Sequence, residues 1–371
     1  MKKLLIIAGN ARSLSANRQD LIRAIQTKGW QVEALVPTAD YLPSVEGLGI
    51  PIHKISLGRT GINPVSDIKS VWQMRTLIRE IQPTAVFSYT VKPVIFGSIA
   101  ARLAGVKRCY SMVTGLGYVY TTKTLKTRLL KFLVSGLYRV AFSLNERVFF
   151  QNPDDIHDFE SIGVIKNHKK ITRTYGSGIA LERFPIAELP NGPTTFLFIG
   201  RLLTEKGVAE FCEAAEYVKK SSPTTRFIAV GPYEPGLPHS IREIDYQAYR
   251  ASGVVEFVGG VGDVKPYIAD SHVFVLPSYR EGTPRSVLEA MSMRRAIITS
   301  DAPGCRETVE HGVNGFLTPL RDARKLSEYM LKFVEQPELI DKMAHESRRI
   351  VEELYDVRKV NDTMLTAMQI N

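Results

Sequence analysis

The sequence predicts an α/β protein made of two doubly wound domains, each with a parallel sheet between layers of helices. The chain has 371 residues, whereas a single hydrophobic core stops growing at roughly 250–300 residues. Short apolar runs alternate with stretches of helical periodicity, which is typical of βα units. The alternation stops at a segment rich in proline and glycine, 184–193, and then starts again. We therefore expect domains at residues 1–187 and 188–371, with the last helix, 350–371, as a candidate to pack back on the first.

The first half of the chain contains five apolar runs of strand length. These runs lie at 4–8, 31–36, 85–89, 109–113 and 147–151. Apolar residues recur at helical spacing at 17–28, 65–81, 94–104, 124–144 and 154–162. The pattern predicts a parallel sheet whose strands are joined by helical crossovers.

The second half repeats this organisation. Its strand candidates lie at 195–199, 226–230, 254–258, 273–276 and 296–299, and its helical patterns at 208–220, 241–251, 264–269 and 285–293. The tail, 322–368, reads as helices with breaks near Pro337 and Tyr355. Ligands of open parallel sheets bind beyond the carboxyl ends of the strands. Two such domains, facing each other across a cleft, would place functional residues in the loops that follow the strands.

Cysteine usage and hydropathy limit where the protein can work. Cys109, Cys212 and Cys305 lie far apart and form no CxxC pair, which disfavours a disulfide framework or a zinc knuckle and fits a reducing cytosol. The apolar run at 4–9 is too short for a signal peptide. The longest apolar stretch, 132–144, is broken by an arginine and is shorter than the roughly 20 residues that span a bilayer. We therefore expect no transmembrane helix.

Positive charge is concentrated in the first half of the chain. The net charge is +10, and residues 1–185 hold 26 Lys and Arg against 12 Asp and Glu. This asymmetry predicts an anionic partner, either nucleic acid, a lipid surface or a phosphorylated acceptor. A solvated lysine-rich surface is the alternative. The chain has no zinc finger and no aromatic-rich RNP sequence, so we do not expect nucleic acid as the partner.

The loop after the first strand candidate of the second half has the features of an anion site. It reads GRLLTEKG at 200–207 and opens into a helix. Glycines let the backbone approach a ligand, the helix start offers N–H groups, and the cations Arg201 and Lys206 match a diphosphate. The loop lacks a GxxxxGK[ST] sequence, so an ordinary βα turn with surface cations is the alternative.

A pair of glutamates follows a later strand of the same half. Gly282 and Pro284 place Glu281 in the loop, whereas Glu289 falls on the following helix. The two carboxylates would therefore reach different parts of one extended ligand. Carboxylates accept hydrogen bonds from sugar hydroxyls, and the amides of Gly282 and Thr283 at the helix start suit a sugar or phosphate oxygen. The alternative for each glutamate alone is a solvated surface charge.

These two loops together resemble the signature of retaining glycosyltransferase family 4, which has the GT-B fold. The resemblance rests on PSYREGTPRSVLEAM at 277–291 combined with GRLLTEKG at 200–207. It continues through 259–264, 300–307 and 312–317, and so covers essentially the whole second half of the chain.

Three segments of the first half resemble a narrower group within this family. They are SYTVKP at 88–93, TGLGY at 114–118 and QNPDD at 151–155. The group contains bacterial N-acetylgalactosaminyl and related transferases that extend sugars on undecaprenyl diphosphate. The resemblance therefore implies an acceptor of this lipid-linked class.

The family resemblance implies roles for the loop residues of the second half. Arg201 and Lys206 would neutralise the donor diphosphate in place of a divalent metal, so we expect no metal and no cofactor. Glu281 would contact hydroxyls of the transferred sugar. The implied mechanism is a front-face substitution, in which a donor phosphate oxygen helps to deprotonate the acceptor. Glu281 would therefore not act as a covalent nucleophile. Glu289 would bind the ribose. The other implied donor-binding residues are Gly200, Gly231, Val261, Gly282, Thr283 and Pro284.

The acceptor side departs from the family pattern. Many members carry a double glycine in the first loop and a histidine in the first domain, whereas this chain has Gly9 and Asn10 and, near the expected histidine, Lys92. We expect Lys92, close to a strand end, to bind an acceptor phosphate; a surface lysine is the equally supported alternative. Gly115 and Gly117 complete the predicted acceptor residues.

The segment 123–133 combines cations with leucines and aromatic residues at helical spacing. Such a composition is typical of an amphipathic helix at a membrane interface, and a core-packed helix with a charged outer face is the alternative. The lipid-linked acceptors and the basic first half favour contact with anionic lipids, at about 1 kcal/mol for each nearby cation. We expect a cytoplasmic protein bound peripherally to the inner face of the plasma membrane.

The sequence thus predicts a glycosyltransferase that moves a sugar, expected to be an N-acetylhexosamine, from a UDP-sugar to a lipid-diphosphate-linked saccharide in surface glycan synthesis. Two alternatives share its fold or its binding residues. A nucleotide-sugar 2-epimerase would act on the donor without any acceptor. A non-catalytic sugar-nucleotide sensor would bind the donor and transfer nothing.

Overall fold

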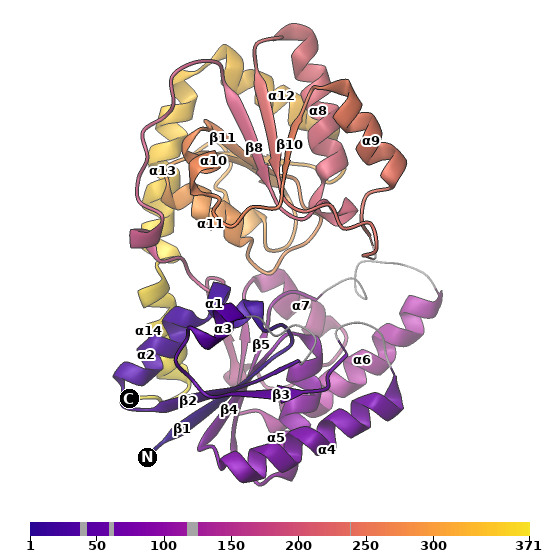
Figure 1. Cartoon of the computed structure of the whole chain (residues 1–371), viewed down its shortest axis with the longest axis vertical. Helices are drawn as coiled ribbons and strands as arrows, with labels where there is room; N and C mark the ends of the chain where they lie inside the picture. The colour runs from indigo at the N-terminus through magenta and orange to yellow at the C-terminus, as the bar shows by residue number, and fades with distance from the viewer. Residues whose placement is uncertain (38–42, 59–62, 117–124, 238) are drawn as a thin grey trace. The chain divides into compact units, whose positions relative to one another are not determined.

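The computed structural model describes residues 1–37, 43–58, 63–116, 125–237 and 239–371. The chain divides into two compact units (Figure 1). The first unit comprises Met1–Ser177 together with Arg358–Asn371, and the second comprises Gly178–Val357. The segment at 184–193, predicted as a linker, therefore lies within the second unit, and the end of the chain belongs with its beginning.

A parallel sheet forms the centre of the first unit, with seven strands among the described residues. The strands are β1 (Lys3–Ala8), β2 (Gln31–Pro37), β3 (Ile52–Ile55), β4 (Ala85–Tyr89), β5 (Arg108–Val113), β6 (Arg147–Phe150) and β7 (Ile171–Arg173). Their order is β3-β2-β1-β4-β5-β6-β7, and Leu4 of β1 pairs with Val32 on one side and Ala85 on the other. The order reverses between β1 and β4, and ligands of such sheets usually bind where this happens.

Helices cover both faces of the first sheet. They are α1 (Arg12–Asn17), α2 (Gln19–Thr27), α3 (Pro43–Glu46), α4 (Pro64–Ile81), α5 (Ser98–Leu103), α6 (Leu125–Leu144), α7 (Pro153–Ser161) and the last helix of the chain, α14 (Val357–Ala367). Successive side chains of a strand point to opposite faces, so Leu4 and Ile6 pack with α2 and α14, whereas Leu5 and Ile7 pack with α4 and α5. Both layers are apolar, which explains why the central strands read as continuous hydrophobic runs.

The second unit repeats the architecture with a six-stranded parallel sheet among its described residues. Its strands are β8 (Thr195–Ile199), β9 (Arg226–Val230), β10 (Glu256–Gly259), β11 (Val273–Leu276), β12 (Ala296–Ser300) and β13 (Gly315–Thr318), in the order β10-β9-β8-β11-β12-β13. Its helices are α8 (Val208–Ser221), α9 (Glu243–Ser252), α10 (Lys265–Ala269), α11 (Arg285–Ser292), α12 (Ala323–Glu335) and α13 (Glu338–Leu354). The strand order reverses between β8 and β11, the strands that precede the two loops singled out by the sequence.

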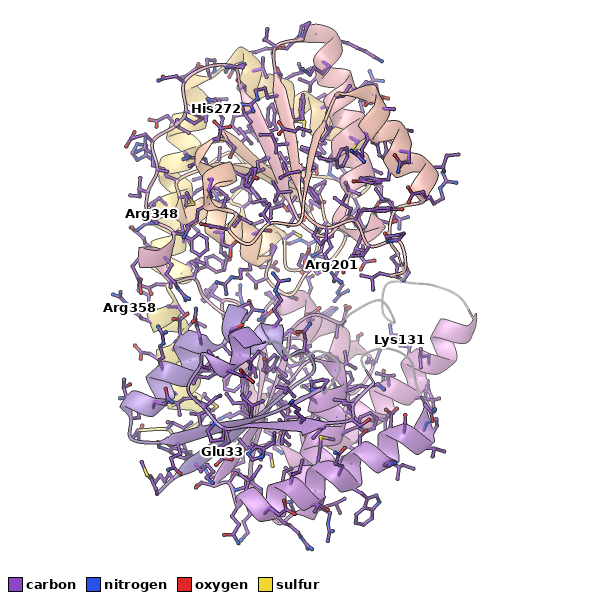
Figure 2. The ribbon with its side chains drawn as sticks, viewed as in Figure 1. Glu33, Lys131, Arg201, His272, Arg348 and Arg358 are labelled. Atoms are coloured by element: carbon purple, nitrogen blue, oxygen red, sulfur yellow. The ribbon has the colours of Figure 1, made fainter. Side chains whose placement is uncertain are left out.

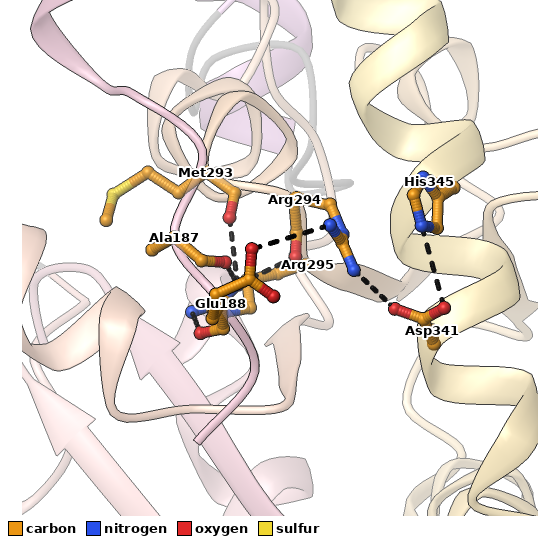
Figure 3. A network of polar contacts seen from close by, with 7 residues as sticks. All are labelled: Ala187, Glu188, Met293, Arg294, Arg295, Asp341 and His345. Atoms are coloured by element: carbon orange, nitrogen blue, oxygen red, sulfur yellow. Dashed lines mark hydrogen bonds and ion pairs between the residues drawn. The ribbon is translucent and has the colours of Figure 1, made fainter.

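A buried arginine fastens the predicted linker to the second unit (Figure 3). The guanidinium of Arg295 donates to the carbonyl oxygens of Ala187, at 2.8 Å, and Glu188, at 3.0 Å. It also donates to the carbonyl oxygens of Ile268 and Ala269. Burial lowers the pKa of Arg295 to about 10, so the side chain is still charged at neutral pH. These bonds explain why the proline-rich segment belongs to the body of the unit.

The structure confirms the predicted fold class, because both halves are α/β with parallel sheets. The strands β4, β8, β9 and β11 occupy the predicted ranges. The sequence did not predict β3, β7 and β13, which lie at sheet edges and are only three or four residues long. Within the described parts of the chain, no helix combines the length and the apolar character needed to cross a bilayer.

Candidate functional site

Four loops of the second unit end up at one edge of its sheet. Gly200 follows β8, Gly231 follows β9, Val261 lies just beyond β10 and Glu281 follows β11. The strands are parallel and neighbouring, so their carboxyl ends meet at the same edge. We call this the second-unit edge. It gathers the residues that the sequence assigned to donor binding.

Glycines let these loops approach one another closely. A Cβ on Gly231 would lie 1.8 Å from the carbonyl oxygen of Gly200, and one on Gly207 would lie 2.2 Å from that of Pro277. The φ angle of Gly207 is +72°, which other residues rarely adopt. Gly231 N donates to Gly259 O at 2.8 Å. The loops after β8, β9, β10 and β11 thus form one packed assembly of backbone.

Lys206 and Glu281 form an ion pair at the second-unit edge. Lys206 lies in a 3-10 turn, Thr204–Lys206, just before α8, and its Nζ donates to Oε1 of Glu281. The two side chains are only 23% and 13% exposed, so their attraction is less screened than on an open surface. The structure therefore brings the cation predicted for the diphosphate into contact with the carboxylate predicted for the sugar.

Arg201 has different surroundings. Its side chain is exposed on the loop after β8 (Figure 2) and makes no ion pair or hydrogen bond with any residue that the structure describes. A guanidinium in this state is available to an anion and can contact two of its oxygens. Among the described residues, no group of three or more His, Cys, Asp or Glu side chains is placed to hold a metal ion.

A tyrosine anchors the loop that carries Glu281. The hydroxyl of Tyr279 donates to Oε1 of Glu210, on the first turn of α8, at 2.5 Å, and Tyr279 N donates to Glu205 O at 2.9 Å. Burial and the Glu210 carboxylate raise the pKa of Tyr279 above its usual range. The guanidinium of Arg321 lies 4.7 Å from the ring centre. No local pattern in the sequence singled out Tyr279 or Glu210, because a hydrogen bond across 69 residues leaves no local signal.

Glu281 is fixed from its other side by the loop after β12. Glu281 N donates to Pro303 O at 2.9 Å. Gly304 has φ +80°, and a Cβ there would lie 2.2 Å from the Glu281 carbonyl oxygen. Gly282 and Thr283 then lead into α11, whose N-cap position is occupied by Pro284. Glu281 thus lies in the loop ahead of the helix, as its neighbours predicted.

Glu289 lies on α11, one turn after its partner Arg285. Arg285 Nε donates to Glu289 Oε1 at 2.9 Å, and the Glu289 side chain is 12% exposed. Burial raises the pKa of the Glu289 carboxyl, and the nearby guanidinium of Arg285 opposes part of this effect. A buried carboxylate with one oxygen committed to Arg285 can still accept hydrogen bonds from a diol.

The predicted acceptor residues gather at the equivalent edge of the first unit. Gly9 and Asn10 follow β1, Lys92 lies three residues beyond β4, and Gly115 follows β5. We call this the first-unit edge; the predicted Gly117 lies outside the described residues. A Cβ on Gly9 would lie 2.2 Å from Oγ1 of Thr90, so the loops after β1 and β4 touch.

Lys92 is held in an ion pair rather than exposed as a surface lysine. Its Nζ lies 2.7 Å from Oδ1 of Asp67 on α4, with the two side chains 15% and 5% exposed. An acceptor phosphate at this position would have to share the ammonium group with Asp67. The pair holds the loop after β4 to the first turn of α4.

The first-unit edge also contains a buried arginine, Arg18, that no sequence motif predicted. The guanidinium of Arg18 lies 5.0 Å from the ring centre of Tyr89, and its Nη2 contacts Sδ of Met112 at 2.8 Å. The hydroxyl of Tyr89 lies 2.8 Å from Oγ of Ser13. Burial raises the pKa of Tyr89 to about 12. Only the place of Tyr89 inside the SYTVKP sequence pointed to this cluster.

Some polar atoms near the same strand ends are buried without a hydrogen-bond partner among the described residues. They are Oδ1 of Asn10, Oγ of Ser88 and Oγ1 of Thr90. Such atoms cost free energy unless a ligand or water satisfies them, so they tend to mark binding sites. Ser88 and Thr90 belong to the SYTVKP sequence, whereas Asn10 is a predicted acceptor residue.

Two family models match the chain. The family described as glycosyl transferases group 1 matches residues 193–336, and the family described as glycosyl transferase 4-like matches residues 4–152. The first match contains the second-unit edge from Gly200 to Glu289. The second contains the first-unit edge from Gly9 to Gly115.

Named relatives and solved structures agree with these matches. The chain is 28% identical over 335 residues to the N,N'-diacetylbacillosaminyl-diphospho-undecaprenol α-1,3-N-acetylgalactosaminyltransferase of Campylobacter jejuni, with 87% of this chain and 86% of that protein covered. It is 29% identical over 301 residues to the UDP-Gal:α-D-GlcNAc-diphosphoundecaprenol α-1,3-galactosyltransferase of Escherichia coli, covering 77% and 74%. The structure resembles Anabaena HepE in complex with UDP-glucose over the full length of both chains, with a TM-score of 0.79 at 19% identity.

Both halves of the chain match glycosyl transferase models, and the structure as a whole resembles that of HepE. The resemblance to HepE by itself supports only the fold, because the sequence identity is 19%. Taken with the family matches and the named relatives, it shows that the chain is a glycosyltransferase with the GT-B fold.

Proposed function

We propose that this glycosyltransferase moves an N-acetylhexosamine from a UDP-sugar to a lipid-diphosphate-linked saccharide, with retention of configuration, in surface glycan synthesis. The observation that carries the proposal is the Lys206–Glu281 pair at the second-unit edge, with the exposed Arg201 on an adjoining loop. This arrangement offers cations to a diphosphate and a carboxylate to sugar hydroxyls within one packed set of loops.

Charge exchange explains how these residues would serve the donor. Lys206 is compensated by Glu281 before the donor binds, and the donor diphosphate would take over that ammonium group while Arg201 contacts further phosphate oxygens. Glu281 would then turn its oxygens to hydroxyls of the transferred sugar. Fixed positive charge stabilises the negative charge that develops on the departing diphosphate, which is the role of a metal ion in other transferases. We propose that this chain needs no metal.

The reaction we propose is a front-face substitution. The acceptor hydroxyl oxygen bonds to the anomeric carbon as the bond from that carbon to the diphosphate oxygen breaks. The hydroxyl proton passes to a donor phosphate oxygen, and UDP leaves. Glu281 contacts the sugar without forming a covalent bond, and Glu289 accepts hydrogen bonds from the ribose. Gly231 and Val261 border the base.

The acceptor assignment draws on the relatives and on the first unit. The named relatives from Campylobacter jejuni and Escherichia coli act on saccharides linked to undecaprenyl diphosphate. The first-unit edge offers Lys92 for a phosphate, and unpaired oxygens of Asn10 and Thr90 for hydroxyl groups. The excess of cations in residues 1–185 and the helix α6 support contact with the anionic inner face of the plasma membrane. Lys123 and Thr124 of the predicted membrane segment lie outside the described residues.

A donor panel tests this function. Each of four donors is supplied with a short polyprenyl-diphosphate sugar, and the lipid product is identified by mass spectrometry. The donors are UDP-N-acetylgalactosamine, UDP-N-acetylglucosamine, UDP-galactose and UDP-glucose. We expect one added N-acetylhexosamine, in the same anomeric configuration as in the donor by NMR. Lys206→Ala and Glu281→Ala should each lower the rate about 100-fold or more, while Lys220→Ala, at an exposed lysine in the last turn of α8, should not.

The same assay separates the alternatives. A product formed from the donor alone would indicate a 2-epimerase, and binding of UDP-sugar without any transfer would indicate a sensor. A chelating agent should leave the rate unchanged if fixed side-chain charge replaces the metal. Loss of turnover with chelator, restored by Mg²⁺ or Mn²⁺, would overturn the metal-free part of the proposal.

A further inference from the structure

A cavity of about 410 Å³ lies in the first unit, away from the first-unit edge. It is formed by the end of α6, the segment 164–167 and the beginnings of β6 and β7. The predicted acceptor residues follow the carboxyl ends of the strands, whereas this cavity lies where β6 and β7 start. The length of a four-residue strand, roughly 13 Å, therefore lies between the two places.

The walls of the cavity combine apolar surface with positive charge. Apolar side chains such as Val140, Phe142 and Ile165 line it together with Arg139, Lys166 and Lys170. None of the lining residues is acidic. A ligand that fits these walls has both a hydrocarbon part and an anionic part.

Among the described residues, the three cations of the cavity contact only uncharged hydrogen-bond acceptors or make no polar side-chain contact. Arg139 donates from Nε to Gly163 O at 2.8 Å and from Nη2 to Ile162 O at 3.0 Å, and Lys170 Nζ donates to Ser143 O at 3.0 Å. These carbonyl groups orient the cations but carry no net charge, and Lys166 is exposed. No ion pair with a described carboxylate compensates Arg139, Lys166 or Lys170. The cavity thus has a surplus of positive charge for an incoming anion.

An exposed apolar stripe on α6 leads to this cavity. Phe132 is 74% exposed, Leu133 53% and Val140 49%, which is unusual for side chains of this size. Phe132 and Val140 are eight residues apart and share a helix face with Gly136 between them, where a Cβ would meet nothing within 4 Å. Val140 also lines the cavity. Figure 2 labels Lys131 on α6, the neighbour of Phe132 in the sequence.

We propose that this cavity, with the α6 stripe, binds the phosphate headgroup and upper acyl chain of an anionic membrane phospholipid. The inference deepens the membrane contact of the proposed function. The ligand is a bulk lipid rather than the reacting acceptor, because a diphosphate held here would lie a strand length away from the first-unit edge. The cations would bind the headgroup phosphate, and the stripe would enter the interface.

Direct titration tests the cavity in the full-length protein. Calorimetry without any sugar donor measures the binding of four compounds. They are dihexanoyl-phosphatidylglycerol below its micelle concentration, dihexanoyl-phosphatidylcholine, glycerol phosphate and farnesyl diphosphate. We expect phosphatidylglycerol to bind at least tenfold more tightly than each of the other three. Equal binding of glycerol phosphate would overturn the amphiphilic site, and tighter binding of farnesyl diphosphate would overturn the assignment to bulk phospholipid.

Charge reversal at the cavity provides the matched comparison. The double variant Lys166→Glu/Lys170→Glu and the single variant Val140→Asp should each weaken phosphatidylglycerol binding at least tenfold. Lys28→Glu, an exposed lysine after α2 on the other face of the sheet, should leave it unchanged. An equal loss with Lys28→Glu would show general electrostatic attraction and overturn the site. Circular dichroism and the melting temperature check that each variant is folded.

Vesicle binding and transfer separate this inference from the proposed function. The double variant should sediment less with vesicles of phosphatidylglycerol and phosphatidylcholine than the unaltered chain does. It should keep its rate on a short, water-soluble prenyl-diphosphate sugar. Full transfer by a chain that fails to bind phosphatidylglycerol would overturn the lipid site alone, whereas lipid binding without any transfer would overturn the proposed function alone.

Discussion

At the scale of single residues, the Lys206–Glu281 contact determines how the second-unit edge meets a ligand. Two opposite charges that compensate each other remain stable in a partly buried loop, whereas either charge alone would pay a desolvation cost. A diphosphate can replace Glu281 as the partner of Lys206, which leaves the carboxylate to other contacts. Under the proposed function, this exchange would let the two residues bind the diphosphate and the sugar of one donor together.

Tyr279→Phe should reduce transfer about tenfold, because the loop carrying Glu281 loses its hydrogen bond to Glu210. We expect kcat to fall while KM for the UDP-sugar changes little, since the contacts to the nucleotide are kept. Glu210→Gln, made in the chain that keeps Tyr279, preserves a hydrogen-bond acceptor for it and should retain most of the rate. A Tyr279→Phe variant with normal kcat would contradict a positioning role.

The affinity for UDP should depend on the protonation of Glu289. Because burial raises the pKa of this carboxyl above its ordinary value of 4.5, lowering the pH from neutrality protonates it while most exposed carboxylates remain charged. Protonation removes a charged acceptor for the ribose, so we expect UDP binding to weaken about tenfold through this range. Calorimetry at several pH values measures the effect.

The control for this titration is Glu289→Gln. UDP itself changes its protonation state as the pH falls, and this contribution is the same for the variant and the unaltered chain. The variant should bind UDP more weakly at neutral pH and show only the dependence that UDP contributes. Identical pH profiles for the two proteins would contradict a role for Glu289.

The charged residues of the site were predictable from the sequence, whereas the residues that hold them in place were not. Glu281 and Glu289 stand in one recognisable segment, so their places in a loop and on a helix follow from Gly282 and Pro284. Tyr279 belongs to the same segment, but its partner Glu210 is distant in the sequence. Contacts of this kind depend on how α8 packs beside the loop, and no local pattern encodes that packing.

At the scale of secondary-structure elements, the segment 184–193 shows how composition can mislead. Its prolines and glycines are typical of a linker, yet the buried guanidinium of Arg295 binds its carbonyl oxygens and holds it to the second unit. The long central strands were predictable because both faces of each sheet are buried, which produces unbroken apolar runs. Short edge strands such as Ile52–Ile55 contain polar residues and give no such signal.

Arg295→Met should lower the free energy of unfolding by about 3 kcal/mol or more, because several buried carbonyl groups lose their donor. Denaturant titration followed by circular dichroism measures the change. Arg294→Met is the matched control: its ion pairs join Asp341 and Glu188, whose side chains are 53% and 87% exposed, and should together be worth about 1 kcal/mol or less. Equal effects of the two substitutions would mean that the carbonyl bonds contribute little.

At the scale of the whole molecule, the first unit is built from two separate stretches of the chain, Met1–Ser177 and Arg358–Asn371. Helix α14 returns to that unit, where Met364, Leu365 and Met368 join the core beside β1 and β2. The carbonyl oxygen of Met368 accepts hydrogen bonds from Arg108, at 2.7 Å, and from the Tyr110 hydroxyl, at 2.9 Å. The first unit therefore depends on residues at both ends of the chain.

Deletion of residues 358–371 should unfold the first unit or lower its melting temperature strongly. Each buried apolar side chain removed costs about 2–5 kcal/mol, and the sum approaches the stability of a typical domain. The second unit keeps its core, so UDP should still raise the temperature of its own calorimetric transition. Gln369→Ala is the control with an unchanged profile. A single transition unaffected by the deletion would contradict the dependence of the first unit on α14.

The return of α14 has a consequence during protein synthesis. The second unit is one continuous stretch and can fold as soon as it has left the ribosome. The first unit must wait until residues 358–371 have been synthesised, so its β-strand core stays incomplete and exposed until then. Nascent chains stalled before residue 358 should therefore bind chaperones through the half that was made first.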